Sequence, residues 1–345
     1  MIYYTNIFRI DIFCCRGICG FMFRKLFLPV GILVALLLSF ACPAPGVFVK
    51  ELQWNNYFII VTFLICGWGV DFSTFKFDRR FAAVLAGAAV VAMIIAPLLG
   101  WALATVLGIG ALPMAGLLAI MAAPPTLSSG VAMTASAGGN ALLALIMTVG
   151  YNLLGVITMP LIFTLCLHGG EDIVFDPVQM FLKLVLLVLL PTLVGYAGKW
   201  LTKKALPRIF HYISALAVIL LVLGFFSGSR EQFLSRSGGV LLLEGGCALV
   251  LHVLLLLVML LMSFVLKTKA PEAKAMIFCG ASKTVTIGLT TLDIIGLGSG
   301  EAMVTCLVYY FVQSVVDSLV AGKIGFSEQK LKESENASDG KCMEA

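Results

Sequence analysis

The residues most able to bind an ion or ligand lie in a polar interruption of an apolar segment, residues 281–288, which reads Ala-Ser-Lys-Thr-Val-Thr-Ile-Gly. Lys283 is well inside this segment, where its ammonium is poorly placed to reach a membrane surface. An ionisable residue at membrane depth is costly unless it faces protein or water, so it marks a functional site. This lysine is predicted to act as a fixed charge or, because burial favours the neutral amine, as a proton carrier.

A second segment repeats the pattern. Residues 126–131 and 284–289 share Thr-x-[Ser/Thr]-x-Gly-[Val/Leu]. The first copy follows Pro124 and Pro125, which lack an N–H and clash with the preceding turn, so a helix should break there. Broken backbone at membrane depth survives only where protein or water satisfies its polar groups. Two interrupted segments in corresponding halves are typical of a transporter binding site.

Each second half-helix would begin near a hydroxyl residue, Thr126 or Thr284, which suits an N-cap position. A helix N-terminus carries partial positive charge and free amides. Two such ends meeting near the membrane midplane would bind an anionic group. The alternative is a proline kink whose hydroxyls bond back to the helix, but the repeated motif favours a site.

Composition defines the class of protein. The 345 residues are 61% hydrophobic and 12% charged, with a mean hydropathy of +1.06. These values indicate a polytopic membrane protein rather than a soluble domain. The net charge of +5 does not suggest a nucleic-acid partner, since the basic residues lie between apolar segments.

Scattered cysteines without zinc-ligand spacing indicate buried free thiols. The absence of a nucleotide-binding loop argues against a primary pump. The absence of paired acids, a metal-ligand cluster or nucleophile–base spacing argues against an intramembrane enzyme.

Ten segments are long enough to span a membrane, for which about 20 apolar residues are needed. Of the 23 Lys and Arg residues, a cytoplasmic N-terminus places 18 inside, three outside and two within spans. The positive-inside rule therefore predicts that both termini are cytoplasmic. The predicted spans are 26–44, 55–71, 81–107, 111–137, 140–168, 178–198, 210–228, 239–266, 272–295 and 301–322.

Ten spans divide into two halves of five, and an odd number in each half requires opposite orientations, an inverted-topology repeat. One offset maps Gly139 to Gly300 and Asn152 to Gln313, so two carboxamides are predicted to face each other across a central cavity. The sequence predicts a cytoplasmic leader at residues 1–25, in which residues 1–21 are either loosely ordered or lie before the true translation start. Two five-helix repeats follow at 26–168 and 169–322, and then a polar, mobile cytoplasmic tail at 323–345.

Other polar residues within spans give weaker signals. His252 is predicted to be a hydrogen-bonded packing residue. Glu244 is predicted to be an interfacial acid. Asp317 and Lys183 lie near span ends and are predicted to face lipid headgroups.

Residues 123–131, followed by Gly138-Gly139-Asn140, resemble the bile acid:sodium symporter family, most closely its sodium/bile acid cotransporter 7-like branch. Residues 278–288 resemble the second motif of that branch, and Tyr309 with Gln313 resembles its last span. The resemblance extends from about residue 27 to 322.

This resemblance implies ten transmembrane helices in two inverted five-helix repeats, with broken, crossing helices 4 and 9, divided into panel and core domains. Members of the family typically carry organic anions with two sodium ions. The resemblance implies that Ser129 and Thr148 are sodium ligands. Two expected ligand positions are Gly130 and Ala144 here, and the family's sodium-binding glutamate near Lys283 is absent.

The resulting hypothesis is a secondary active transporter of a small organic anion that works by alternating access in a bacterial inner membrane. Lys283 would take the place of a sodium ion, so the coupling ion is a proton, one sodium ion or none. The alternative is a non-transporting membrane regulator of ion homeostasis. A monomer in the lipid bilayer is expected, and the substrate and transport direction are left open. The predicted charge-compensating residues are Ser128, Ser129, Thr148, Ser282 and Lys283, and the predicted substrate-binding residues are Thr126, Asn152, Thr284, Thr286 and Gln313.

Overall fold

The computed structural model describes residues 27, 30–69, 79–126, 129–167, 173, 175–207, 209–298 and 300–343, with the backbone alone for 211 and 325–343. Within these ranges every regular element is a helix. The predicted leader, residues 1–25, and Ser128 lie outside the described residues. The helices that follow Val30–Ala41 are α2 (Ala44–Glu51), α3 (Trp54–Gly69), α4 (Arg79–Val90), α5 (Ala96–Val106), α6 (Ala111–Ala122), α7 (Ser129–Ser136), α8 (Ala141–Leu167), α9 (Pro177–Leu184), α10 (Leu190–Thr202), α11 (Ile209–Gly228), α12 (Arg230–Ser235), α13 (Gly238–Val265), α14 (Ala270–Ala281), α15 (Val285–Ile294) and α16 (Glu301–Met343), with π-helical turns η1 (Val91–Ile95) and η2 (Val185–Leu189).

Six helical stretches in the described chain are long and apolar enough to cross a membrane, and a bent pair, Val30–Ala41 with α2, would be a seventh. The sequence predicts ten. The difference arises because α3 has 16 residues, α6 has 12, and the apolar part of α11 extends only from Tyr212 to Gly228. The six are Arg79–Val106, Ala141–Leu167, Pro177–Thr202, Gly238–Val265, Ala270–Ile294 and Glu301–Ile324.

The helices pack as two groups. In the first group, α3 lies against α10 and α11, and α11 lies against α2. Close approach depends on glycine, since a Cβ at Gly67 would lie 1.9 Å from the carbonyl oxygen of Thr192. A Cβ at Gly195 would lie 2.0 Å from the carbonyl oxygen of Leu64. Small residues that bring backbones together are a common means of packing helices in membranes.

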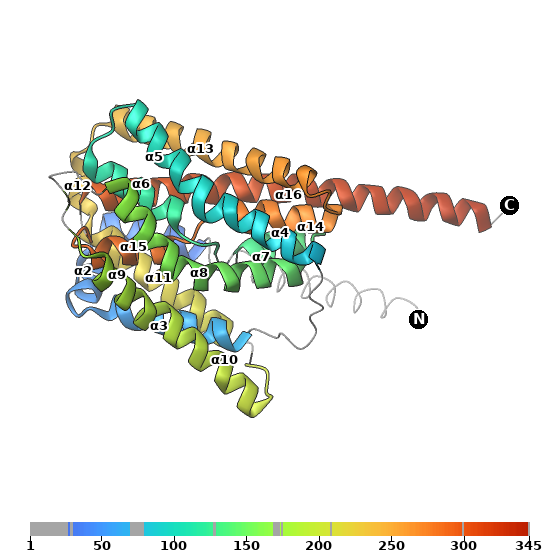
Figure 1. The fold of residues 1–345 in the computed structure, drawn as a ribbon, viewed down its shortest axis with the longest axis horizontal. Helices are drawn as coiled ribbons and strands as arrows, with labels where there is room; N and C mark the ends of the chain where they lie inside the picture. The colour runs from blue at the N-terminus through green and yellow to red at the C-terminus, as the bar shows by residue number, and fades with distance from the viewer. Residues whose placement is uncertain are drawn as a thin grey trace, which may run out of the picture.

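The second group contains α4 to α8 and α13 to α16 (Figure 1). In this group α6 lies against α15 and α16, and α14 lies against α7, α8 and α13. Gly116 permits the contact of α6 with α16, because a Cβ there would lie 2.0 Å from the carbonyl oxygen of Ala302. This group carries both predicted helix breaks.

Helix α16 extends beyond the bundle as far as Met343 (Figure 1). The polar tail is therefore helical over residues 323–343, which the prediction of a mobile tail did not anticipate; its Glu, Gln and Lys residues are good helix formers. We call the end of the bundle from which α16 projects the tail end, and the opposite end, near α2 and α12, the loop end.

Candidate functional site

Both repeated motifs lie at interruptions between helices. Helix α6 ends at Ala122 and α7 begins at Ser129, whereas α14 ends at Ala281 and α15 begins at Val285. We call residues 123–126 break one and residues 282–284 break two. The backbone N–H of Thr284 donates to the carbonyl oxygen of Pro124 at 2.8 Å, so the two breaks are in contact.

Break one is held by local capping and by one side chain from α8. The hydroxyl of Thr126 accepts from the backbone N–H of Gly130 at 3.1 Å and is also hydrogen-bonded to the hydroxyl of Ser129. Thr126 thus satisfies an amide in the first turn of α7, as expected of a capping residue. The amide of Asn152 donates to the carbonyl oxygen of Pro125 at 3.2 Å.

Break two is held by side chains of α16. The Gln313 carboxamide accepts from the backbone N–H of Lys283 at 2.9 Å and donates to its carbonyl oxygen at 2.5 Å. The hydroxyl of Ser282 donates to Asp317 Oδ2 at 2.5 Å. Gln313 and Asp317 are four residues apart on one helix and therefore face the same side. Thr284 is the N-cap residue of α15 but makes no capping bond with its side chain.

Lys283 is 0% exposed, and its Nζ donates to the carbonyl oxygen of Ala92 in η1 at 2.5 Å. This carbonyl is free for a local reason. In the π-helical turn the N–H of Ala96 bonds to Val91, and the next residue in the register, Pro97, has no N–H to offer Ala92. The ammonium replaces the missing donor.

The sequence analysis groups Lys283 with Ser128, Ser129, Thr148 and Ser282 as charge-compensating residues. The acceptor that the structure describes for its Nζ is instead a backbone carbonyl in another span. A proline inside the predicted span 81–107 was the available signal, since it leaves carbonyls without donors.

Asp317 was expected to face lipid headgroups, and this is wrong. Its side chain is 2% exposed, and its Oδ1 lies 2.9 Å from Nε2 of His252 on α13. The reason is that α13 packs against α16 along this face and brings the histidine opposite the carboxylate. His252 is a buried, hydrogen-bonded residue, in agreement with the sequence analysis.

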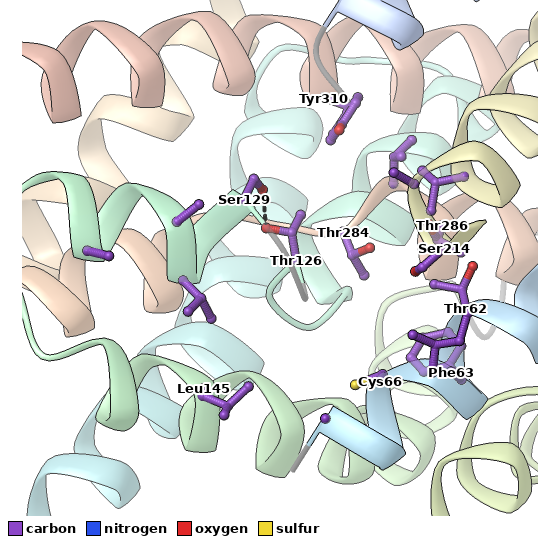
Figure 2. A pocket seen from close by; sticks show the side chains of 18 residues that line it. Thr62, Phe63, Cys66, Thr126, Ser129, Leu145, Ser214, Thr284, Thr286 and Tyr310 are labelled. Atoms are coloured by element: carbon purple, nitrogen blue, oxygen red, sulfur yellow. Dashed lines mark hydrogen bonds between the residues drawn. The ribbon is translucent and has the colours of Figure 1, made fainter. Parts of the chain in front are cut away.

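A cavity of about 530 Å³ lies between the two helix groups (Figure 2). Thr126 and Ser129 line it from break one and the start of α7, and Thr284 and Thr286 line it from break two and α15. The other group contributes α3 and α11, which include Ser214. Among the described residues, those lining the cavity include no charged side chain.

The remaining predicted residues are buried outside this lining. Asn152 and Gln313 do not face each other across the cavity; each holds one of the two breaks. Ser282 and Lys283 face α16 and η1, respectively. Thr148 bonds to Ala144 of its own helix and to Cys279 of α14. The assignment of Ser129 and Thr148 to one sodium site stays a prediction.

The chain is similar to known membrane transporters. The sequence profile of the SBF-like CPA transporter family matches residues 26–325. A probable sodium/metabolite cotransporter BASS4, chloroplastic, of Arabidopsis thaliana is 30% identical over 213 residues, 57% of this chain and 49% of that protein.

The BASS4 protein of Oryza sativa subsp. indica, with the same description, is 24% identical over 318 residues, 86% of this chain and 75% of that protein. Sodium/bile acid cotransporter 7 of Mus musculus is 24% identical over 225 residues, 61% of this chain and 64% of that protein. The matches thus cover between about half and three quarters of these relatives.

Proposed function

Because the chain belongs to the SBF-like CPA transporter family, we propose that it is a secondary transporter of a small organic anion that works by alternating access. The match and the relatives named sodium/bile acid cotransporter 7 confirm the resemblance to the bile acid:sodium symporter family. The chain is an integral membrane protein of a transporter family and not an enzyme.

The observation that carries the proposal is the meeting of the two breaks beside the cavity. The N–H of Gly288 is already directed to the carbonyl oxygen of Thr284, whereas the amides before it in α15 have no capping side chain. Val285 and Thr286 line the cavity. The start of α15 therefore offers unpaired amides, partial positive charge and hydroxyls, which suit a carboxylate or sulfonate.

A protonated Lys283 would supply the positive charge that the cavity lining lacks. Its Nζ donates to a backbone carbonyl oxygen that lacks a helical N–H partner, and backbone carbonyls without such partners coordinate sodium in other transporters. We infer that the ammonium acts as a built-in cation beside break two, so that anion binding does not require the sodium ion held by the family's glutamate. A cavity of this size is within the usual range for small-molecule sites.

Alternating access would occur between the two helix groups. Gly69 at the end of α3 and Ala135 near the end of α7 extend the cavity lining toward the tail end. At the loop end, Nζ of Lys50 in the first group donates to the carbonyl oxygen of Gly298 in the second at 2.7 Å. Together with the charge distribution of the sequence, this favours a state open toward the cytoplasm, in a ten-span protein with cytoplasmic termini in a plasma membrane.

The test is thermal stability of the purified chain with acetate, succinate and taurocholate, each as its sodium, potassium and choline salt. A ligand at 100 times its Kd should stabilise the folded protein by about 2.7 kcal/mol. For the wild type, we expect an anion to stabilise equally with all three cations. Lys283→Glu should make any such stabilisation dependent on sodium, because a buried carboxylate beside a carbonyl needs a cation.

Lys204→Glu is the matched control, because it makes the same change at an exposed lysine outside the helices, and it should behave as the wild type. If Lys283→Glu does not fold, Lys283→Met should weaken anion stabilisation in every salt. An unchanged cation dependence in Lys283→Glu would overturn the built-in cation. If no anion stabilises the wild type, the protein is better explained as a regulator that does not transport.

A further inference from the structure

Four buried polar side chains, none of which lines the cavity, form a continuous chain of contacts. The hydroxyl of Tyr309 lies 3.5 Å from His252 Nδ1, and His252 Nε2 lies 2.9 Å from Asp317 Oδ1. Asp317 Oδ2 accepts from Ser282 at 2.5 Å. None of the four is more than 2% exposed. We propose that the His252–Asp317 pair is a proton-binding site whose occupancy is transmitted to break two through Ser282.

The residue types favour a proton over a metal ion as the ligand. Among the described residues there is no group of three or more His, Cys, Asp or Glu side chains that could hold a metal. An imidazole and a carboxylate in contact can share one proton and remain neutral as a pair, or bind a second and become positive. No ion pair is described between Asp317 and Lys283, whose Nζ is directed to Ala92.

The hydrogen bonds explain how the proton would act on the backbone. An ionised Asp317 accepts through both oxygens, so it can take the N–H of His252 and the O–H of Ser282 together. A protonated Asp317 carries an O–H, so one of these two bonds must reverse or be lost. If the proton lies on Oδ2, the bond that changes is the one from Ser282, the first residue of break two.

The surroundings add few competing charges. Cys279 on α14, with Tyr309 and Tyr310 on α16, lies within electrostatic reach of Asp317. At the loop end Arg236 pairs with Glu244 and Glu301. The other charged or titratable groups on α13, on α16 as far as Lys323 and on the helices packed against them are Arg79, Arg80, Arg230, Glu231, Cys247, Glu272, Lys274, Asp293, Cys306 and Lys323, and the sequences of α5, α6 and α7 carry none.

The path to the cavity is short. Ser282 precedes Lys283, whose backbone is held by Gln313, and then Thr284, which bonds to Pro124 and lines the cavity. A proton that loosens or tightens Ser282 would therefore change anion affinity, and the anion would change proton affinity by the same factor. This link rests on the proposed function, whereas the proton site itself does not.

The chain contains only three histidines, so nuclear magnetic resonance of isotope-labelled histidine side chains in the full-length protein can follow His252 directly. His252→Gln assigns its resonance. We expect this resonance to report a change of protonation state within the pH range over which the protein stays folded. Asp317→Asn should move the midpoint, because it removes the carboxylate with which the imidazole shares the proton.

Ser282→Ala should also shift the midpoint, since it removes a hydrogen bond to the ionised carboxylate. Glu272→Gln is the control, because it neutralises a partly exposed carboxylate on α14 that pairs with Arg80, and it should leave the midpoint unchanged. If His252 keeps one protonation state over this range, or if its midpoint is the same in Ser282→Ala, the proposal is overturned even where Asp317→Asn does not fold.

Titrations with acetate, succinate and taurocholate separate the two proposals. An anion that stabilises the protein without moving the His252 midpoint would leave the transporter proposal standing and remove the link between proton and cavity. If the pair titrates and responds to Ser282→Ala, but the protein binds none of the three anions, the result would support the proton site. It would count against the proposal that the protein transports a small organic anion.

Discussion

Break one and break two carry the same motif, yet different parts of the molecule maintain them. At break one, two consecutive prolines end the helix, Thr126 caps the start of α7, and Asn152 adds one bond to Pro125. Break two contains no proline. There Gln313 makes two bonds with the backbone of Lys283, Asp317 holds Ser282, and the lysine reaches across to Ala92.

The difference shows that one motif can be maintained locally in one half of a protein and by tertiary contacts in the other. Proline terminates a helix wherever the chain packs, since it has neither the N–H nor the space for the preceding turn. Ser-Lys-Thr has no such effect, and its backbone groups are stable at membrane depth because α16 and break one satisfy them. Break two is therefore the element that its neighbours can change.

The largest expected effect is on the bonds that hold break two. Gln313→Met removes the partners of both the N–H and the carbonyl of Lys283, whereas Asn152→Leu removes the partner of one carbonyl at break one. Each buried group left unpaired costs about 1–3 kcal/mol. Reversible unfolding in mixed micelles should show that Gln313→Met loses roughly twice as much stability as Asn152→Leu. Equal losses would contradict the proposed difference between the breaks.

The next effect concerns the bond between the breaks. Thr284→Pro removes the N–H that Pro124 accepts, at a residue whose φ of −84° is close to that of proline. Thr284→Ala keeps the N–H and is the matched control. We expect Thr284→Pro to be less stable than Thr284→Ala by about 1–3 kcal/mol in the same unfolding measurement. Stability within error of the control would mean that the two breaks do not depend on this contact.

The smallest effect concerns the capping hydroxyls. Thr126→Ala removes a side chain that accepts from Gly130 and should cost about 1 kcal/mol, a typical value for a lost cap. Thr284→Ala removes a hydroxyl without a capping bond and should cost only a few tenths of that value. Melting temperatures of the two variants would measure the difference, and the reverse order would show that the caps are wrongly assigned.

Much of the fold could be anticipated because the signals are local. High hydropathy indicates helices in a bilayer, and consecutive prolines predict an interruption of a helix. The membrane class and break one could therefore be predicted from the sequence. The repeated motif extended the inference to break two. The number of spans was harder to predict from the sequence, because α3 and α6 are shorter than a full span and where they end depends on their packing.

The candidate site was only partly accessible. Thr126, Ser129, Thr284 and Thr286 line the cavity, whereas Asn152 and Gln313 hold the breaks. Residue type identified them as polar groups within a membrane, but the side toward which each points depends on how α8 and α16 pack against the breaks.

By itself the sequence determined a helical membrane protein of a transporter family, with two interrupted segments and a lysine within the second. Only the tertiary structure decided what that lysine contacts, because its acceptor lies 191 residues away in sequence, on a carbonyl that a π-helical turn and Pro97 leave free. It also decided that Asp317 meets His252 rather than lipid headgroups. Apolarity and proline act through the chain's own backbone, whereas the partners of buried charges are set by which helices pack together.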